Sequence, residues 1–231
     1  LYYRKTFSKD FSKQVDENLF LRNDYNDTLI KSIAESPLLP KKQYKYSDFS
    51  FILFKEFLEK TYNQTLDVLV DQNFYKKLET STLTYNPLRK FDISIIPPTE
   101  EDQYFRYTKV QGYVHDMAAA MQNGVSGHAG LFGNALDVAK MMQMYLNKGT
   151  YGGIEFFKPE TIHAFNECYS CKEGNRRGLG FDKPQLGTAG PTCGCTSKSS
   201  FGHTGFTGTM TWADPEKDWF KVFVSIGRIP N

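Results

Sequence analysis

An α+β fold is predicted for this 231-residue chain by the order of its helical and strand patterns. Apolar residues recur at helical spacing through the first two thirds, and β-rich runs joined by a turn occupy the end. Helices followed by an antiparallel hairpin favour α+β over alternating βαβ units. We expect a mainly helical region over residues 1–160 and an antiparallel strand region over residues 161–231, together forming one domain.

Composition narrows the classes of function. Hydrophobic residues make up 40% and charged residues 23%, as in soluble globular proteins, and the aromatic share of 15% predicts a large packed core. A net charge of +2 is too small to attract nucleic acid over long range. No apolar run approaches the roughly 20 residues that cross a bilayer. We therefore expect no nucleic-acid partner and no membrane span. We also expect no cofactor.

Helical periodicity marks several segments of the first two thirds. It is weak around residues 25–33 and strong after Ser47 or Asp48, either of which can cap a helix N-terminus. The buried face expected for that second helix comprises Phe49, Ile52, Leu53, Phe57 and Leu58. A third helix is predicted over residues 65–77, with an inner face of Leu66, Leu69, Val70 and Phe74.

A glycine-rich bend over residues 124–130 leads into a further predicted helix. Asn134 is a natural N-cap, and Gly149 follows the expected end of that helix. Its expected buried stripe is Leu136, Ala139, Met142 and Leu146. Pro159 suits the first turn of another short helix.

Strand patterns dominate the last third. Residues 178–181 read as a strand, and residues 201–213 and 219–226 are β-rich runs. The segment Asp214-Pro215-Glu216-Lys217 between the two runs has turn composition, which predicts a hairpin.

Four cysteines form two close pairs, Cys168/Cys171 before the run at residues 178–181 and Cys193/Cys195 after it. They can form disulfides in an exported protein or remain as free thiols. Four thiolates can also hold tetrahedral zinc, although C-x-C is a less common half-site than C-x2-C. The spacing leaves all three states open.

Two short motifs carry candidate chemistry. Tyr46-Ser47-Asp48 precedes a predicted helix, and His203-Thr204-Gly205 begins the terminal hairpin. Each alone is common, because Ser and Asp cap many helices and a strand histidine is usually structural. Together, and with Gly127-His128-Ala129-Gly130 between them, they resemble the second and third motifs of the serine β-lactamases and penicillin-binding proteins. The chain most resembles the Tyr-x-Asn branch and the β-lactamase-like domain fused behind family 3 glycoside hydrolases.

The resemblance implies catalytic roles for four residues. Tyr46 would act as general base on a serine hydroxyl, and Asp48 would stand where the family has Asn. A carboxylate there accepts hydrogen bonds but cannot donate them unless protonated. His203 would replace the Lys that binds a substrate carboxylate, and Thr204 would hydrogen-bond the substrate or Tyr46. We expect Tyr46 and the His203–Thr204 pair to converge across one groove.

Further residues are implied in substrate binding. The N–H of Phe206 is the candidate oxyanion donor, flanked by Gly205 and Thr207. His128 could line the cleft or instead bond backbone carbonyls within its loop, and Arg177 could approach a substrate carboxylate.

The nucleophile of the family is not found. No Lys has Ser three residues earlier, so the sequence lacks Ser-x-x-Lys. We expect a fragment of an exported, periplasmic or cell-surface serine hydrolase that cleaves an amide, peptide or ester, with cell-wall material among the expected substrates. The fragment by itself is expected to be inactive. The family's preceding strands, nucleophile helix and C-terminal helix would be missing, and a second copy or the preceding segment would cover the exposed sheet. The alternative is a non-catalytic binding or scaffolding domain attached to a glycoside hydrolase.

Overall fold

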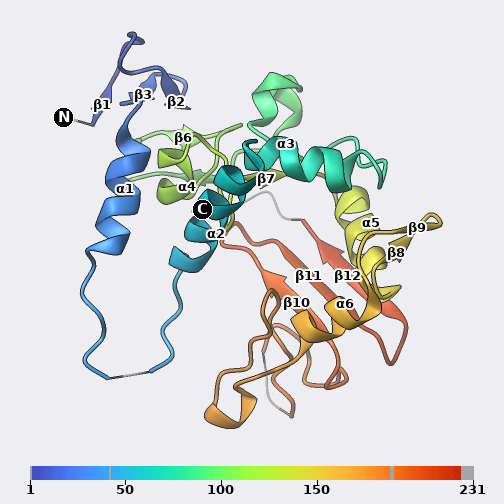
Figure 1. Ribbon diagram of the computed structural model, residues 1–231. Helices are drawn as coiled ribbons and strands as arrows, with labels where there is room; N and C mark the ends of the chain where they lie inside the picture. The colour runs from blue at the N-terminus through green and yellow to red at the C-terminus, as the bar shows by residue number, and fades with distance from the viewer. Residues whose placement is uncertain (1, 42, 188–189, 225–231) are drawn as a thin grey trace. The chain divides into compact units, whose positions relative to one another are not determined.

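The computed structural model describes residues 2–41, 43–187 and 190–224, which form two compact units (Figure 1). The first unit contains the described residues within 2–71 and 84–132. The second contains residues 72–83 and the described residues within 133–224. In the part of the chain that is described, no helix has the length and apolar character needed to span a membrane.

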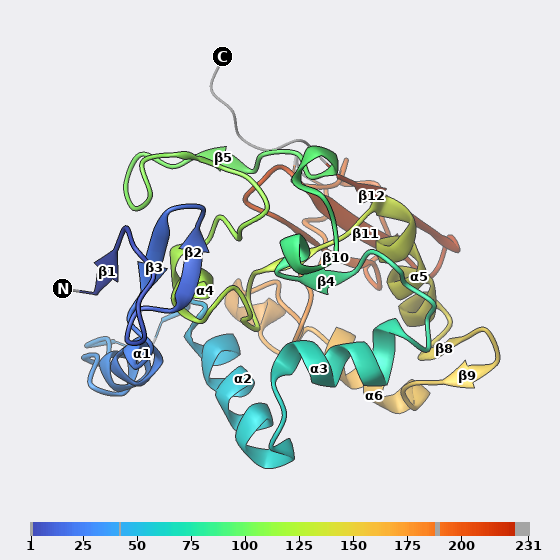
Figure 2. The ribbon, with the colours of Figure 1, turned by 90° about the horizontal axis from the view of Figure 1, so that it is seen from above.

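The first unit is built around a small antiparallel sheet and two helices (Figure 2). Strands β1 (Tyr3–Arg4), β2 (Lys13–Asp16) and β3 (Leu19–Leu21) pair in the order β1-β3-β2. Helices α1 (Tyr25–Ala34) and α4 (Met117–Met121) complete this part. The weak periodicity at residues 25–33 is thereby confirmed as a helix. The buried core residues of this part are Val15, Leu21, Val114, Ala119 and Ala120.

Helix α2 (Phe49–Tyr62) begins after Asp48, as predicted, and the hydroxyl of Ser47 accepts the N–H of Phe49 at 3.3 Å. Its buried residues are Ile52 and Lys55, and Nζ of Lys55 lies 2.8 Å from a carboxylate oxygen of Glu59. The predicted apolar inner face is wrong for Phe49, Leu53 and Phe57, which are exposed. The inner stripe is instead stabilised by an ion pair one helical turn apart.

The remaining elements of the first unit are short. Helix α3 (Leu66–Val70) is followed by a π-helical turn, η1 (Asp71–Tyr75), which passes into the second unit, so the predicted helix over 65–77 is not a single α-helix. Strand β4 pairs with β7 and β5 pairs with β6. Their bounds, with those of two 3-10 turns, are β4 Thr84–Tyr85, η2 Pro87–Arg89, η3 Ile93–Ile95, β5 Glu100–Glu101, β6 Lys109–Val110 and β7 Leu131–Phe132.

The second unit contains an antiparallel sheet of three strands in the order β10-β11-β12. The strands are β10 (Phe201–Thr204), β11 (Met210–Asp214) and β12 (Trp219–Phe223), so the terminal hairpin is confirmed. The first predicted run is two strands, because residues 205–209 form a turn inside it. The second predicted run was expected to reach residue 226, and its residues from 225 onward lie outside the described residues.

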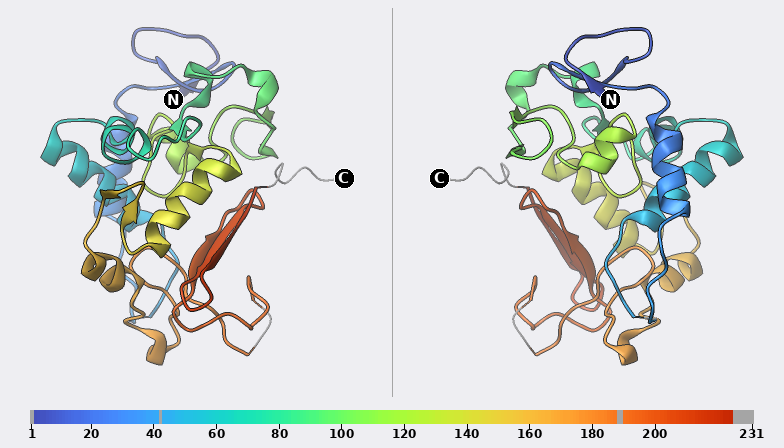
Figure 3. Two further views of the ribbon diagram at one scale, coloured as in Figure 1. Left: turned by 90° about the vertical axis from the view of Figure 1, so that its right-hand side faces the viewer. Right: turned by 90° about the vertical axis from the view of Figure 1, so that its left-hand side faces the viewer.

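Helix α5 (Ala135–Leu146) covers one face of this sheet, where Met142 packs with Phe201 and Ala213 (Figure 3). The side chain of Asn134 accepts the N–H of Asp137 at 2.8 Å, which confirms the predicted cap. The predicted stripe is wrong at Leu136, which is exposed. The carboxylate of Asp137 is buried instead, because it accepts both the N–H and the hydroxyl of Thr82.

The loops before the sheet carry its other short elements, β8 (Thr150–Tyr151), β9 (Ile154–Glu155), α6 (Pro159–Asn166) and the 3-10 turn η4 (Cys171–Glu173). Pro159 opens α6, as predicted. The predicted strand at residues 178–181 is wrong. The N–H of Gly178 donates to the carbonyl of Phe181 at 2.8 Å, which closes a turn that ends in a bridge between Arg177 and Asp182.

Trp212 is buried on the face of the sheet opposite α5, across from Gly202 on β10. Its indole N–H donates to the hydroxyl of Ser200 at 3.1 Å. A Cβ at Gly202 would lie 2.2 Å from the carbonyl oxygen of Thr211 and 2.5 Å from the indole ring. Glycine is therefore required at this position for the indole to lie flat on the strand.

We predict that Gly202→Ala destabilises the protein by about 2 kcal/mol, because neither the strand backbone nor the indole can move away cheaply. The free energy of unfolding from urea titration measures this. Gly180→Ala is the matched control, since a Cβ at Gly180 meets nothing within 4 Å. Equal midpoints for the two variants would contradict the packing described.

Lys183 is a buried cation with neutral partners. Its ammonium donates to Oδ1 of Asn166 at 2.7 Å and to the carbonyl of Ser199 at 3.0 Å. Burial lowers the pKa of Lys183 from 10.5 to about 8, against the opposing effect of Glu167. The folded protein therefore holds this proton less tightly than the unfolded chain does.

The lowered pKa of Lys183 makes the free energy of unfolding depend on pH. Between pH 8 and 10.5 the unfolded state binds more protons at this residue, so its contribution to stability rises with pH and is lost as pH falls through about 8. We predict that the unfolding free energy of the wild type rises by up to about 3 kcal/mol across this window relative to Lys183→Met. Parallel pH profiles for the two proteins would show that Lys183 titrates normally.

Candidate functional site

Strand β10, which carries two of the predicted catalytic residues, lies at the edge of its three-stranded sheet, where Asp182 forms an isolated bridge with Gly202. His203 faces Thr211 and Thr204 faces Met210 on β11. Successive strand side chains point to opposite faces, so His203 lies on the face covered by α5 and Thr204 on the other. Thr204 is exposed and His203 half-buried.

Both ring nitrogens of His203 are hydrogen-bonded. Nε2 lies 3.1 Å from Nη1 of Arg177, and Nδ1 lies 2.6 Å from the carbonyl oxygen of Thr204. A guanidinium only donates and a carbonyl only accepts. Nε2 must therefore accept and Nδ1 must carry the hydrogen, which assigns His203 as the neutral Nδ1–H tautomer in this arrangement.

Arg177 supplies the positive charge beside His203. Its Nη1 lies 2.8 Å from Oδ1 of Asp182, and Nη2 of Arg176 lies 3.2 Å from Oδ2 of the same carboxylate. The backbone of Asp182 pairs with Gly202 through bonds of 2.8 and 3.1 Å, which ties the carboxylate to β10. The side chain of Arg177 is 29% exposed, so solvent reaches it. Arg177 therefore places a positive charge directly beside His203.

The turn after β10 holds the other residues predicted to bind substrate. The N–H of Gly205 donates to the carbonyl of Thr209 at 2.7 Å, and a Cβ at Gly205 would lie 2.2 Å from the hydroxyl of Thr209. Phe206 is exposed and Thr207 half-buried. The role of the Phe206 N–H as an oxyanion donor stays a prediction.

Tyr46 and Asp48 belong to the first unit. Tyr46 is 56% exposed in the segment that precedes α2, and Asp48 occupies the N-cap position without a side-chain capping bond. His203 to Thr207 belong to the second unit. The predicted convergence of Tyr46 with Thr204 stays a prediction.

His128 takes part in a chain of side chains that the sequence did not reveal. Its Nδ1 lies 2.9 Å from the hydroxyl of Ser126, and its Nε2 lies 2.8 Å from Oδ1 of Asp116. That carboxylate also accepts the N–H of Ala119 at 2.7 Å and so caps α4. Burial would raise the pKa of Asp116, but these hydrogen bonds and the nearby histidines outweigh it and lower that pKa.

These residue types are those of a hydrolase triad, but their burial argues for a structural role. Ser126 is 1% exposed and the side chain of His128 is 5% exposed, so a substrate cannot reach either. The histidine bonds side chains rather than the backbone carbonyls we expected. Because Asp116 lies 12 residues before His128, local sequence gave no signal of this contact. We keep His128 out of the proposed site.

The cysteines form two disulfides, Cys168–Cys171 and Cys193–Cys195, which decides between the alternatives left open by their spacing. Among residues 2–41, 43–187 and 190–224, no three His, Cys, Asp or Glu side chains are grouped so as to hold a metal ion.

Comparison with curated proteins identifies relatives along most of the chain. A protein of Escherichia coli K12 named "Putative D-alanyl-D-alanine carboxypeptidase" is 36% identical over 211 residues, which cover 85% of this chain and 48% of that protein. A protein of the same name from Salmonella gallinarum is 33% identical, over 95% of this chain and 53% of its own length. The chain spans about half the length of the curated relatives it matches.

Solved structures show the same fold. A penicillin-binding protein homologue from Caulobacter crescentus matches with a TM-score of 0.61 at 17% identity, over 89% of this chain and 59% of that one. A penicillin-binding protein from Bacillus halodurans matches with a TM-score of 0.60 at 13% identity, over 85% and 56%. The model of the beta-lactamase family matches residues 6–230. The α+β chain described above therefore belongs to the beta-lactamase family, whose fold and serine-hydrolase kinship it shares.

Proposed function

We propose that this chain is the part of an acyl-enzyme hydrolase that recognises a peptide ending in a free carboxylate. One observation carries the proposal: Arg177, held by Asp182 and by the neutral ring of His203, lies beside the edge strand β10. A guanidinium binds a carboxylate through paired N–H donors, and an edge strand binds extended peptide through its backbone.

The names of the curated relatives support this substrate class. A D-alanyl-D-alanine carboxypeptidase acts on a peptide with a terminal carboxylate, and two relatives above 30% identity carry that name. The substrate of this chain would then be a cell-wall peptide. Two disulfides support an oxidising compartment, such as the periplasm or the cell surface.

Catalysis would need a nucleophile from outside this sequence. In the proposed mechanism, Tyr46 removes the proton of that serine and Asp48 orients the substrate amide, as the Tyr-x-Asn branch implies. Thr204 would hydrogen-bond the substrate on β10. The chain has no Ser three residues before a Lys. By itself it would therefore bind its substrate without turning it over.

The missing motif also favours a second candidate, a binding or scaffolding domain without catalysis. Attachment to a family 3 glycoside hydrolase, which the resemblance suggested, stays a prediction, as does cover of the sheet by a second copy. The residue at the nucleophile position of the full-length protein distinguishes the two functions. Serine followed by Lys three residues later supports the hydrolase.

The proposal predicts that binding depends on the terminal carboxylate. We expect the chain to bind N-acetyl-D-alanyl-D-alanine about tenfold more tightly than the corresponding C-terminal amide, because one charge-assisted interaction is lost in the amide. Arg177→Ala should abolish this difference. Isothermal titration calorimetry with both ligands measures it. Arg176→Ala is the matched control, since Arg176 also pairs with Asp182 but is not bonded to His203.

Equal affinities of the wild type for acid and amide would refute carboxylate recognition. A second assay tests the dependence on an external nucleophile. The chain alone should leave nitrocefin and p-nitrophenyl esters intact, and turnover by the purified chain would contradict the mechanism.

A further inference from the structure

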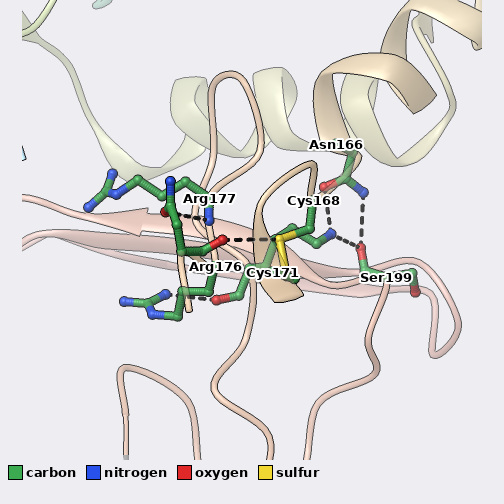
Figure 4. Close-up of a disulfide and its surroundings, with 8 residues drawn as sticks. Asn166, Cys168, Cys171, Arg176, Arg177 and Ser199 are labelled. Atoms are coloured by element: carbon green, nitrogen blue, oxygen red, sulfur yellow. Dashed lines mark hydrogen bonds between the residues drawn. A yellow bond between two sulfur atoms is a disulfide. The ribbon is translucent and has the colours of Figure 1, made fainter. Parts of the chain in front are cut away.

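The Cys168–Cys171 disulfide lies in the segment that leads directly to Arg176 and Arg177 (Figure 4). It closes a ring of four residues between the end of α6 and the turn η4, with its Cα atoms 5.5 Å apart. Cys171 is exposed and Cys168 half-buried. A reductant in solution can therefore reach the bond.

A short path of hydrogen bonds connects this ring to Arg177. The carbonyl of Ser170, inside the ring, accepts the N–H groups of Glu173 and Asn175, each at 3.1 Å. Oδ1 of Asn175 accepts the backbone N–H of Arg177 at 3.2 Å. The guanidinium of Arg177 then reaches Nε2 of His203 at 3.1 Å. The ring therefore holds the carbonyl of Ser170 in place, and the backbone that leads to Arg177 is hydrogen-bonded to this carbonyl.

We propose that the Cys168–Cys171 disulfide positions Arg177, so that reduction of this bond weakens carboxylate binding at β10. The disulfide is a redox-dependent positioning element of the site. This inference rests on the proposed function, because it concerns the same arginine.

The redox step is thiol–disulfide exchange with an external dithiol. A thiolate of the reductant attacks Sγ of Cys171, the S–S bond breaks, and Cys168 leaves as a thiolate that takes a proton from water. The second thiol of the reductant then displaces Cys171 from the mixed disulfide. The protein gains two electrons and two protons, and the reductant becomes its own disulfide.

We expect opening of the Cys168–Cys171 bond to change only the structure around it. A disulfide that closes so short a loop constrains the unfolded chain little. The buried cluster of Met142, Phe201 and Ala213 contains no residue of the ring. The sheet should therefore remain folded when the bond is opened.

The second disulfide provides a matched control. Cys193–Cys195 also closes a short ring in the same unit, and the carbonyl of Cys195 accepts a hydrogen bond from the ammonium of Lys217. Removing Cys193–Cys195 tests for the general effects of a lost disulfide, because the hydrogen bonds between the other ring and Arg177 stay intact.

The experiment compares the wild type with Cys168→Ser/Cys171→Ser, Cys193→Ser/Cys195→Ser and Arg177→Ala. Calorimetry measures the affinity of each for N-acetyl-D-alanyl-D-alanine and for its amide. We expect the first double variant to lose about tenfold in affinity for the acid and none for the amide, and the second to match the wild type. The dithiol-reduced wild type, checked by thiol alkylation and mass spectrometry, should behave as the first double variant.

A readout without ligand separates this inference from the proposed function. In 15N-histidine NMR spectra, the Nε2 signal of His203 should shift in Cys168→Ser/Cys171→Ser toward its position in Arg177→Ala. An unshifted signal would overturn the positioning role, whatever the ligand does. If Arg177→Ala loses acid preference while the first double variant keeps it, the proposed function stands and this inference fails.

If no variant or wild type distinguishes acid from amide, the proposed function fails. A shifted His203 signal in the first double variant would then still support the structural link between the disulfide and Arg177.

Discussion

The carboxylate of Asp182 is the constraint on which the candidate site depends. It lies within 3.2 Å of one nitrogen of Arg176 and 2.8 Å of one nitrogen of Arg177, and its side chain is 6% exposed. A carboxylate this buried needs an opposite charge beside it, and the two guanidinium groups supply that charge. Because the same residue pairs with Gly202 through its backbone, its ion pairs connect the two arginines to the edge strand, while Asn175 connects the backbone of Arg177 to the loop before it.

The contacts of Arg177 with Asp182 and His203 indicate which side chain carries the positive charge here. The resemblance to the family placed His203 where other members have lysine, and a histidine changes charge near neutral pH. In the structure Nε2 of His203 accepts from Arg177, so the ring is neutral and the arginine is charged. A guanidinium keeps its charge at any pH that proteins withstand. Arg177 therefore places a permanent positive charge beside a residue that can titrate.

Local sequence patterns predicted the elements whose signals are local. The cap at Asn134, the helix start at Pro159 and the terminal hairpin are set by neighbours a few residues apart, and all three are confirmed. The inner face of α2 was predicted only at Ile52, because burial of Lys55 depends on its pairing with Glu59 rather than on apolar spacing. Hydrophobic periodicity has no means of showing that a charged stripe is buried.

The sequence predicted only part of the candidate site, because some of its contacts join residues that are far apart in the chain. Motif resemblance identified His203 and Thr204, but the contact that assigns their chemistry joins Arg177 to His203 across 26 residues. The strand expected at residues 178–181 is a turn because Gly178 bonds Phe181, and that turn brings Arg177 back toward Asp182. Cysteine spacing alone left disulfides, free thiols and the less common zinc site open. The contact between Arg177 and His203 joins residues that are far apart in the sequence, and a short stretch of sequence does not contain both partners.

The protonation of the His203 ring tests the arrangement most directly, since every role assigned to Arg177 requires Nε2 to accept. Long-range 15N–1H correlation spectra of the wild type at pH 7.5 report which ring nitrogen carries the hydrogen. We expect Nδ1 protonated and Nε2 bare. An Nε2–H tautomer or an imidazolium at that pH would contradict the contact between Arg177 and His203, and with it the proposed recognition of a carboxylate.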